Sequence, residues 1–495
     1  MKRLSLSTLS EVPHTSRPRI DPRGIGVGIV HLGLGAFHRA HQADFTEEAM
    51  ARAGGDWGIC GVSPRSPRVV DAVGPQDGLY SLLVREPDGS RARVLAPLRG
   101  WLVAPNDPDA VAARISDPTI RIVTLTVSEK GYRHDPATGR LRRDDPEVVA
   151  DAVGRPPRTV VGLLVRGLQR RMTTSGAPIA VLCCDNLPHN GATLATVVDD
   201  FVEMLPDGDE LREWMKSSVS FPSCMVDRIV PATTARDRDE VAALLGLRDE
   251  AVVVAEPFRQ WVIEDEFPAG RPAWERAGAL LVSDVRPYEL AKLRMLNGAH
   301  SLLGYLGALA GIDTIAETMS RDYFAVAAGN LMTQDAARSF EPPPSLDLAA
   351  YAEDLLERFA NPGLHYRTLQ VASDGSQKLP QRLLGTIRDR RAAGALPRWA
   401  VLAVAGWMRW VWTPVTDVGT PRVLDDPMAS RLETLVSAVD DAAEVVDRLL
   451  GVREIFGDDL VGDAVLRAAL RDDLARLAAD GADAAVRAIV AETAR

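Results

Sequence analysis

Four polar side chains that can transfer protons or hydrogen-bond to oxygen recur at helical spacing in the second half of the chain: Glu289, Lys292, Asn297 and His300. On a helical wheel of about 100° per residue with Glu289 at zero, the other three fall, in that order, at roughly −60°, +80° and +20°. Leu293 and Leu296 fall within the same arc, so the polar groups share a face with leucines. Because burying ionisable groups costs several kcal/mol unless they are paired or used, this face indicates a functional site.

A single helix is expected to carry this face. It is predicted to begin just after Arg286-Pro287, since proline is well tolerated at a helix start. Ala291 and Arg294 fall on the opposite face, and no other apolar stripe competes with the leucines. The alternative is a surface helix whose polar side faces water.

A glycine-rich turn lies between a predicted strand and a predicted helix near the start of the chain. The strand is Gly26–Leu32, the turn is Gly33-Leu34-Gly35, and the helix is Gln42–Ala53. Glycines let the backbone approach phosphates, and free N–H groups at the helix start bind the anion. The pattern predicts a pyrophosphate site, although His38 replaces the third glycine of the usual fingerprint. A bare tight turn is the alternative.

The predicted strand Trp57–Val62 completes a β-α-β unit with these elements. The residues after it, Ser63-Pro64-Arg65-Ser66-Pro67-Arg68, include no acidic residue to bind the ribose diol of NAD. Arg65 or Arg68 could accept a 2′-phosphate instead, which leaves the cofactor preference open. Solvated loop charges are the alternative for both arginines.

Two further buried strands, Arg121–Val127 and Ile179–Cys184, also end in polar residues. The first leads into Ser128-Glu129 and the second into Asp185-Asn186, with Asn190 shortly after. Ligands of open α/β sheets bind at the carboxyl ends of strands, so these residues are candidates for a site. Turn formation and helix capping are the alternatives for the two asparagines.

Composition and patterning together predict two domains. A length of 495 residues exceeds one ordinary core, and the hydrophobic content of 46% is typical of a globular protein. The N-terminal part is α/β, with Tyr80–Val84 and Ala92–Leu98 predicted to pair as a hairpin. From Tyr288 onward the pattern is almost wholly helical. We therefore expect an α/β domain over 24–283 followed by a mostly α-helical domain over 284–495.

Charge and cysteine usage restrict the partners and the compartment. A formal charge of −11 argues against nucleic acid or an anionic membrane as the main partner. No apolar run is long enough to span a membrane, and the N-terminus lacks an apolar signal core. The four cysteines show no metal-binding spacing, and adjacent Cys183 and Cys184 are interpreted as small core residues. A reducing cytoplasm is expected.

The helical half contains a second region rich in hydrogen-bond donors, at residues 361–382. Its cations Arg367, Lys378 and Arg382 suit an anionic or polyhydroxy ligand. Ordinary charge on a helical surface is the alternative.

Taken together, these motifs resemble those of the polyol-specific long-chain dehydrogenases, the mannitol dehydrogenase family. The combination is specific, although each segment alone is not. The matching segments run in order from about residue 28 to residue 382 and include Gly33-x-Gly35-x-Phe37-His38-Arg39-Ala40-His41, Gln76-Asp77-Gly78-Leu79-Tyr80, Glu129-Lys130-Gly131-Tyr132, Cys184-Asp185-Asn186-x-Pro188-x-Asn190-Gly191, Val226-Asp227-Arg228-Ile229-x-Pro231, Glu256-Pro257-Phe258 and Lys292-(x)4-Asn297-(x)2-His300.

The resemblance implies an N-terminal Rossmann-type domain, a helical C-terminal domain, an active site between them and no metal ion. Lys292 would be the general acid/base, with a pKa lowered by burial from the free value of roughly 10.4. Asn186 and Asn297 would form an oxyanion hole, His300 would orient substrate hydroxyls, and Glu289 would pass the proton to solvent.

The resemblance also implies NAD as cofactor, with NADP not excluded. The residues that would bind the cofactor are Gly33, Gly35, Ala36, Phe37, His38, Arg39, Arg65, Glu129 and Asp227. The predicted substrate residues are Asn190, Arg367, Lys378 and Arg382, and Asn190 is also a less favoured alternative to Asn186 in the oxyanion hole.

The segment from Arg367 to Arg382 looks more like that of fructuronate reductases (D-mannonate oxidoreductases) than that of mannitol 2-dehydrogenases. A sugar-acid carboxylate needs a cation, which these residues supply. The expected activity is therefore NAD(H)-dependent interconversion of a keto-sugar acid and its alcohol by a monomer or small homo-oligomer. Another hexuronate or fructose as substrate is the nearer alternative. A dinucleotide-binding regulator without catalysis is the more distant one.

Overall fold

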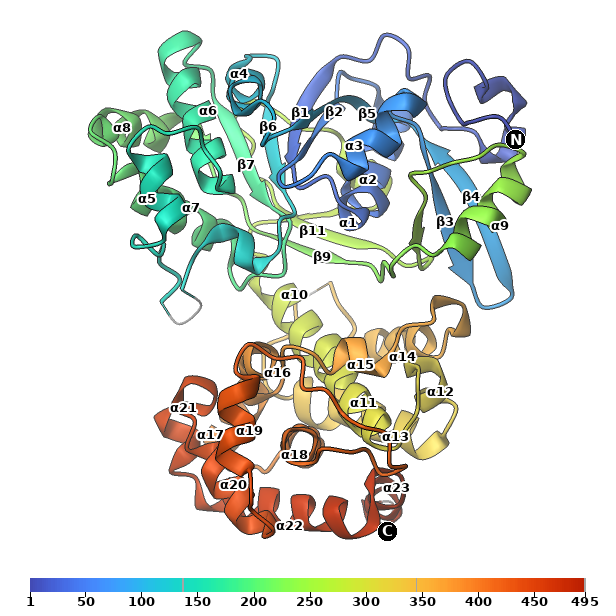
Figure 1. Cartoon of the computed structure of the whole chain (residues 1–495), viewed down its shortest axis with the longest axis vertical. Helices are drawn as coiled ribbons and strands as arrows, with labels where there is room; N and C mark the ends of the chain where they lie inside the picture. The colour runs from blue at the N-terminus through green and yellow to red at the C-terminus, as the bar shows by residue number, and fades with distance from the viewer. Residues whose placement is uncertain (136–137, 344, 494–495) are drawn as a thin grey trace. The chain divides into compact units, whose positions relative to one another are not determined.

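The computed structural model describes residues 1–135, 138–343 and 345–493 (Figure 1). The chain forms two compact units, Met1–Val285 and Arg286–Arg495. Residues 494 and 495, the end of the predicted helical domain, lie outside the described residues. No helix in the described ranges is long and apolar enough to cross a membrane.

The first unit is built on a six-stranded sheet with the order β5-β2-β1-β6-β7-β8. All neighbouring strands in it are parallel. The strands are β1 (Val27–Leu32), β2 (Gly58–Ser63), β5 (Leu98–Val103), β6 (Ile122–Leu125), β7 (Ile179–Cys183) and β8 (Val219–Ser220). The strand order reverses between β1 and β6, which is where doubly wound sheets bind ligands at the carboxyl ends of their strands. The predicted Rossmann-type fold is confirmed.

Side chains alternate between the two faces of this sheet, as the period of two in a strand requires. Val30 and Leu32 of β1 pack in one core cluster, together with residues of α4 (Pro108–Ser116) and α6 (Val160–Thr174). Ile29 packs in another cluster on the opposite face. Both faces are therefore buried, which explains why the strands read as continuous apolar runs.

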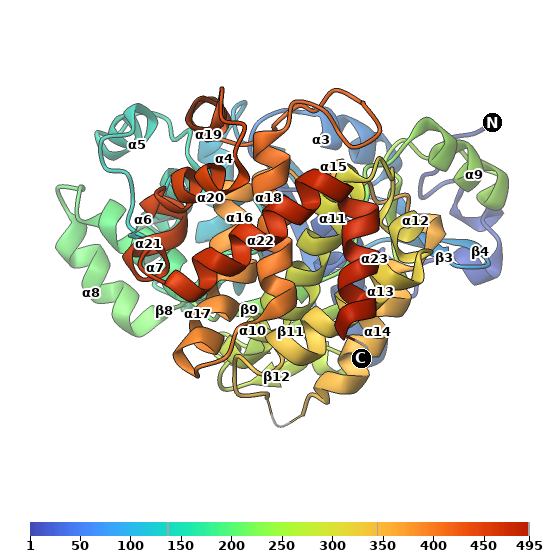
Figure 2. The same cartoon turned by 90° about the horizontal axis from the view of Figure 1, so that it is seen from below.

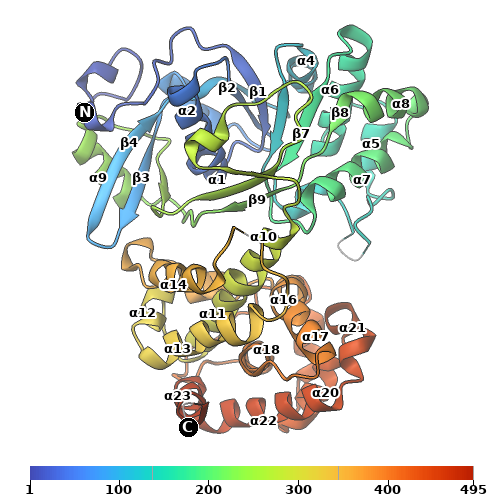
Figure 3. The same cartoon turned by 180° about the vertical axis from the view of Figure 1, so that it is seen from behind.

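Two small sheets accompany the large one. The first has the order β10-β3-β4 and the second the order β12-β11-β9. Their strands are β3 (Tyr80–Glu86), β4 (Gly89–Leu95), β9 (Cys224–Asp227), β10 (Val253–Ala255), β11 (Gln260–Glu264) and β12 (Leu280–Val282). Figure 3 shows the β3–β4 hairpin with α9 (Ala235–Leu245) beside it.

The predicted hairpin forms, but its second strand ends earlier than expected. β4 stops at Leu95, and the chain then enters the separate strand β5 at Leu98. Pro97 stands at this break and cannot donate a backbone hydrogen bond to a sheet ladder. The remaining helices of the first unit are α1 (Ala36–Ala40), α2 (Gln42–Ala53), α3 (Arg68–Val73), α5 (Pro146–Ala152), α7 (Asn190–Val202) and α8 (Gly208–Ser218).

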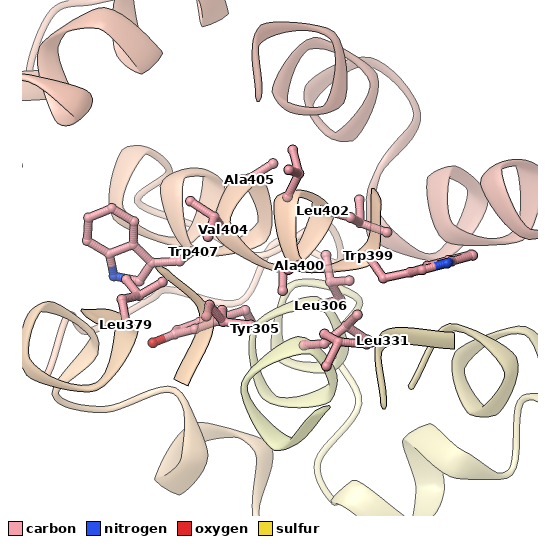
Figure 4. Close-up of a cluster of buried hydrophobic side chains, with 14 of the residues drawn as sticks. Tyr305, Leu306, Leu331, Leu379, Trp399, Ala400, Leu402, Val404, Ala405 and Trp407 are labelled. Atoms are coloured by element: carbon pink, nitrogen blue, oxygen red, sulfur yellow. The ribbon is translucent and has the colours of Figure 1, made fainter. Parts of the chain in front are cut away.

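The second unit is helical, and α18 (Arg398–Trp412) runs through its core. α18 packs against α11 (Gly298–Leu309) and α22 (Ala464–Asp480), and Figure 2 shows α22 crossing it. Twelve of the fifteen residues of α18 are buried. In Figure 4, Trp399, Ala400 and Trp407 of α18 lie near Tyr305 and Leu306 of α11.

The other α-helices of the second unit are mostly short. They are α10 (Arg286–Ala291), α12 (Ile315–Met319), α13 (Asp322–Asn330), α14 (Leu348–Phe359), α15 (Thr368–Val371), α16 (Gly375–Leu379), α17 (Gly385–Ala392), α19 (Ala429–Val436), α20 (Ala442–Leu450), α21 (Arg453–Val461) and α23 (Ala482–Thr493). Three π-helices, η6 (Lys292–Asn297), η7 (Leu331–Ala336) and η9 (Pro380–Leu384), interrupt this helical pattern.

Arg171, at the end of α6, joins two loops of the first unit from the inside. Its guanidinium is fully buried, and burial lowers its pKa to about 10, so the group is still charged at neutral pH. It donates to five backbone carbonyls at 2.7–3.1 Å, those of Ile115, Asp117, Ile120, Ala177 and Pro178. Four of these carbonyls belong to the connections that lead into β6 and β7, and that of Ile115 lies in the last turn of α4.

We predict that Arg171→Met lowers the free energy of unfolding by about 3 kcal/mol or more, because five backbone carbonyls lose a charged donor and two of these hydrogen bonds are fully buried. Urea unfolding measures the change. The neighbouring Arg170 is exposed, so Arg170→Met is the matched control and should stay within about 0.5 kcal/mol of the parent. Equal stability of the two variants would show that the buried guanidinium does not hold these loops.

Candidate active site

The glycine turn after β1 has a backbone that only glycine fits. Gly33 has a φ of +107°, and a Cβ at this position would lie 2.0 Å from the carbonyl oxygen of Thr126. The amides of Gly33 and Leu34 donate to the carbonyl oxygen of Val62 at 2.9 and 3.0 Å. The turn is thereby fixed against the ends of both neighbouring strands, β2 and β6.

A cavity of about 1030 Å³ opens at this turn, wholly within the first unit. Its floor is formed by residues at the carboxyl ends of β1, β2, β5 and β6. Its lining residues are Gly33, Leu34, Gly35, Ser63, Pro64, Arg65, Ser66, Ala104, Pro105, Pro108, Thr126, Val127, Ser128, Lys130, Gly131, Arg133, Glu147, Pro156, Pro157, Arg158, Thr159 and Val160. The size, the position and the glycine cradle fit a dinucleotide.

Only part of the predicted cofactor set lies in this lining. Gly33, Gly35 and Arg65 line the cavity, and Glu129 is exposed in the turn between the lining residues Ser128 and Lys130. Asp227 is buried at the end of β9.

The four residues that follow Gly35 form the first turn of α1. Ala36 and Phe37 are half-buried there. The guanidinium of Arg39 donates to the carbonyl oxygens of Gly35 and Ala251, so it is used inside the unit. The ring of His38 stacks on that of His31 with centroids 3.3 Å apart.

His31, which the sequence interpretation assigned only to a strand, supports the glycine turn from below. One ring nitrogen contacts Thr124 Oγ1 at 2.8 Å, and the other contacts the carbonyl oxygen of Gly33 at 3.0 Å and Thr126 Oγ1 at 2.9 Å. Burial lowers the pKa of His31 to about 3 and that of His38 well below its ordinary value. Both stacked imidazole rings are therefore uncharged at neutral pH, so neither histidine places a charge next to the glycine turn.

The loop after β7 joins the end of that strand to the end of β6. The carboxylate of Asp185 accepts from the amides of Val127 and Ser128 at 2.8 and 3.1 Å, and from the hydroxyl of Tyr132 at 2.7 Å. Burial raises the pKa of Asp185, and these hydrogen bonds oppose that shift. The sequence signal for this role was an acidic residue directly after a buried strand.

Asn190 is buried and fully used in hydrogen bonds within the first unit. Its side chain is 3% exposed. The amide nitrogen donates to the carbonyl oxygens of Asp185 and Cys224 at 3.1 and 2.6 Å, and the amide oxygen accepts from the amide of Cys224 at 3.0 Å. The amide holds β7 and β9 together, and a role of Asn190 toward a substrate stays a prediction. Asn186 is exposed.

The predicted catalytic helix is present but is not a regular α-helix throughout. It runs from α10 through the π-helix η6 into α11. Lys292 and His300 are 6% and 5% exposed, whereas Glu289 and Asn297 are half-buried. A π-turn closes i→i+5 hydrogen bonds, so a wheel with 3.6 residues per turn does not describe the segment from Lys292 to Asn297.

The helix face opposite the leucines, on which Ala291 and Arg294 were predicted to lie, is also buried. The Arg294 guanidinium donates to the carbonyl oxygen and the hydroxyl of Ser339 at 2.6 and 2.9 Å, and forms an ion pair with Asp389 at 2.6 Å. Other segments of the second unit therefore cover this helix on more than one of its faces.

The three π-helices of the second unit meet at this segment. η6, which carries Lys292 and Asn297, packs against both η7 and η9. Arg382 lies in η9, and its guanidinium is 3.4 Å from Ser301 Oγ, one residue beyond His300. Because π-turns frequently mark functional sites, this convergence supports the predicted location.

Aromatic rings enclose His300 within the second unit. Its ring centroid is 4.2 Å from that of Phe359 and 5.5 Å from that of Tyr366. The other two predicted cations occupy different settings. Arg367 is largely exposed and pairs with Asp313 at 2.9 Å, while Lys378 Nζ lies 3.1 Å from Ser373 Oγ.

Within the parts of the chain that the structure describes, no group of three or more His, Cys, Asp or Glu side chains could hold a metal ion.

His41, at the junction of α1 and α2, is a third buried histidine near the glycine turn, and the effect of its burial on stability can be tested. It is fully buried against Phe37, Phe45 and Trp261, and Nε2 lies 2.8 Å from the carbonyl oxygen of Gln260. Burial lowers its pKa from 6.5 to about 3. Below pH 6.5 the imidazole of His41 is protonated in the unfolded chain but stays neutral in the folded chain. The part of the free energy of unfolding that depends on neutral His41 is therefore fully present above pH 6.5 and is lost as the pH falls toward 3.

We predict that His41→Phe removes this pH dependence. Between pH 7 and pH 5 the parent should lose about 2 kcal/mol that the variant keeps, as measured by urea unfolding at both pH values. His14 is exposed, so His14→Phe is the control and should follow the parent. A His41→Phe variant that loses as much stability as the parent would contradict the assignment.

Comparison with known proteins shows the same two-part architecture. Residues 27–276 match the model of the mannitol dehydrogenase Rossmann domain, and residues 284–478 match that of the mannitol dehydrogenase C-terminal domain. The uncharacterized oxidoreductase YeiQ of Escherichia coli (strain K12) is 43% identical over 90% of this chain and 91% of its own length.

Two further relatives have names that state an activity. The D-mannonate oxidoreductase of Escherichia coli (strain K12) is 39% identical over 96% of this chain and 98% of its own. The Pseudomonas fluorescens mannitol 2-dehydrogenase, solved as a ternary complex with NAD and D-mannitol, superposes with a TM-score of 0.89 at 35% identity and covers 99% of both chains. The protein therefore belongs to the mannitol dehydrogenase family of oxidoreductases.

Proposed function

We propose that the protein interconverts a keto-sugar acid of the fructuronate type and the corresponding sugar-acid alcohol, using NAD(H). The observation that carries the proposal is Lys292, an amine buried in a π-helix that packs against the π-helix of Arg382. A buried amine supplies a proton at neutral pH, and a nearby guanidinium suits a substrate carboxylate. The D-mannonate oxidoreductase relative supports this substrate class.

The chain's own residues would act on the substrate oxygen. When bound, the nicotinamide dinucleotide supplies the hydride to the carbonyl carbon or accepts it in the reverse direction. Lys292 protonates the developing alkoxide, and the amide of Asn297 donates to the same oxygen, a hydrogen bond worth about 3 kcal/mol. His300 orients the neighbouring hydroxyls, and Glu289, three residues before Lys292, returns the proton from solvent.

Burial suits the amine of Lys292 to proton transfer at neutral pH. A solvated lysine with a pKa near roughly 10.4 holds its proton too tightly to cycle at neutral pH. Desolvation disfavours the charged form, so we expect the pKa of Lys292 to lie below that of a free lysine.

A polyol such as mannitol is the second candidate substrate, because the solved relative carries D-mannitol. The two candidates differ in one group, a terminal carboxylate in place of a hydroxymethyl group. A dinucleotide-binding regulator without catalysis is the candidate of a different class, but such a protein has no use for a buried lysine in this position.

We predict that Lys292→Ala lowers turnover by about 10²–10⁴-fold, the usual contribution of a general acid/base. Its affinity for the dinucleotide should be unchanged, as measured by fluorescence titration. Lys216 is exposed on α8, so Lys216→Ala is the control and should keep full activity. Undiminished turnover of Lys292→Ala would exclude Lys292 as the proton donor.

We predict that fructuronate and tagaturonate are reduced in preference to fructose, as measured by oxidation of NADH. Arg382→Gln should lower kcat/KM for the acid substrate about 10–100-fold through loss of a charge-assisted hydrogen bond, while fructose reduction changes little. Arg453→Gln, at an exposed cation of α21 outside the predicted substrate residues, is the control and should change neither activity. Reduction of fructose alone would favour the polyol candidate, and binding without turnover of any of the three would favour the regulator.

A further inference from the structure

Arg382, the cation proposed to bind the substrate carboxylate, lies beside the first turn of α11. Its guanidinium is 3.4 Å from Ser301 Oγ, and the side chain is half-buried. A carboxylate offers about four lone-pair sites, and a bidentate guanidinium occupies about half of them. A site built for a carboxylate therefore needs a further hydrogen-bond donor near Arg382.

Tyr366 presents its side chain to the same turn of α11. Its ring centroid is 5.5 Å from that of His300, the residue before Ser301, and the two rings meet edge to face. Burial raises the pKa of the Tyr366 phenol, and the guanidinium of Arg382 opposes that shift, which places the hydroxyl within the field of this cation. The phenol is therefore protonated at neutral pH and can donate a hydrogen bond.

Backbone hydrogen bonds fix the segment that carries Tyr366 to the connection between α11 and α12. The amide of Ile315 donates to the carbonyl oxygen of Tyr366 at 2.9 Å. Two residues further on, the amide of Thr368 donates to the carbonyl oxygen of Asp313 at 2.9 Å. The main chain thus holds Tyr366 in place, and its hydroxyl forms no hydrogen bond with any other residue that the structure describes. The hydroxyl is available to a ligand.

Tyr305 is a second tyrosine near Arg382, but its ring belongs to the core of the second unit. Burial raises its pKa and Arg382 opposes the shift, as for Tyr366. The residue is only 1% exposed, and Figure 4 shows its ring near Trp407 of α18. A Cβ on Gly375 would lie 2.7 Å from the Tyr305 hydroxyl oxygen, so the chain closes over this group. Tyr366 is half-buried and is the better placed of the two to meet a ligand.

We propose that the hydroxyl of Tyr366 binds the substrate carboxylate together with the guanidinium of Arg382 and thereby selects sugar acids over neutral sugars. The inference rests on the proposed function and adds a specificity-determining residue to its substrate site. The phenol donates to one carboxylate oxygen, and the guanidinium donates to the other. A hydroxymethyl group in the same place carries no charge, so it gains less from either donor.

Tyr366→Phe removes the hydroxyl and keeps the ring against His300. We expect KM for fructuronate to rise about tenfold or more, the size of a hydrogen bond to a charged group, while kcat stays within about twofold of the parent. KM for fructose should change by no more than about twofold, because this substrate has no carboxylate. Oxidation of NADH by the full chain measures all four constants. A packing defect would affect the two substrates alike.

Tyr323→Phe is the matched control. The Tyr323 hydroxyl donates to Asp483 at 2.6 Å, in the contact between α13 and α23, so its loss should change KM for neither substrate.

A double variant tests whether the two donors share one carboxylate. Tyr366→Phe should lower kcat/KM for fructuronate less in the Arg382→Gln background than in the parent, because groups that bind the same ligand atoms are coupled. Equal losses in the two backgrounds would contradict joint binding by Tyr366 and Arg382.

The outcomes distinguish the inference from the proposed function. An unchanged KM for fructuronate in Tyr366→Phe, or equal increases in KM for fructuronate and fructose, would overturn the role of Tyr366 and leave the proposed function standing. A parent protein that reduces fructose but neither fructuronate nor tagaturonate would overturn both.

Discussion

A buried lysine constrains the whole second unit. Taking an ammonium group out of water costs several kcal/mol, so the surrounding packing has to supply that free energy. Here η6 holds Lys292 in a π-turn, and η7 and η9 pack against it. Behind them, α18 and α11 form a core of large apolar side chains that includes Trp399, Trp407 and Tyr305 (Figure 4).

In the first unit, the corresponding constraint is the close packing of the Gly33 backbone against the carbonyl group of Thr126. Gly33 leaves no room for a side chain, and backbone hydrogen bonds to Val62 tie the turn to β2. His31 supports the turn from β1, and Thr126 supports it from just beyond the end of β6. The supporting histidines are neutral, so the charge that a bound phosphate meets comes from the cavity wall. Asp185 and Asn190 extend the same arrangement by joining the ends of β6, β7 and β9. These polar groups hold the strand ends and the glycine turn in place through hydrogen bonds within the first unit.

The sequence predicted β1, β2, β6 and β7 of the large sheet because a strand buried on both faces appears as an apolar run. It did not predict β5 or β8, whose residues are mostly half-buried. The sequence also predicted the helix that carries Lys292, from its leucines at helical spacing. It did not predict the π-turn, because a helical wheel assumes a fixed angle per residue and no local sequence signal marks an i→i+5 hydrogen bond. The burial of Arg294 escaped prediction because its partners, Ser339 and Asp389, lie far away in the sequence. The role of Asn190 depends on Cys224 in the same way.

The central claim, that Lys292 supplies the proton, is tested most directly by the pH dependence of kcat/KM for ketone reduction. Only the protonated amine can donate, so kcat/KM should fall tenfold per pH unit above a single apparent pKa. Burial should place that pKa clearly below the roughly 10.4 of a free lysine, and the ionisation should be missing from the residual activity of Lys292→Ala. A rate that stays constant up to pH about 10.4, or an identical fall in Lys292→Ala, would contradict this mechanism.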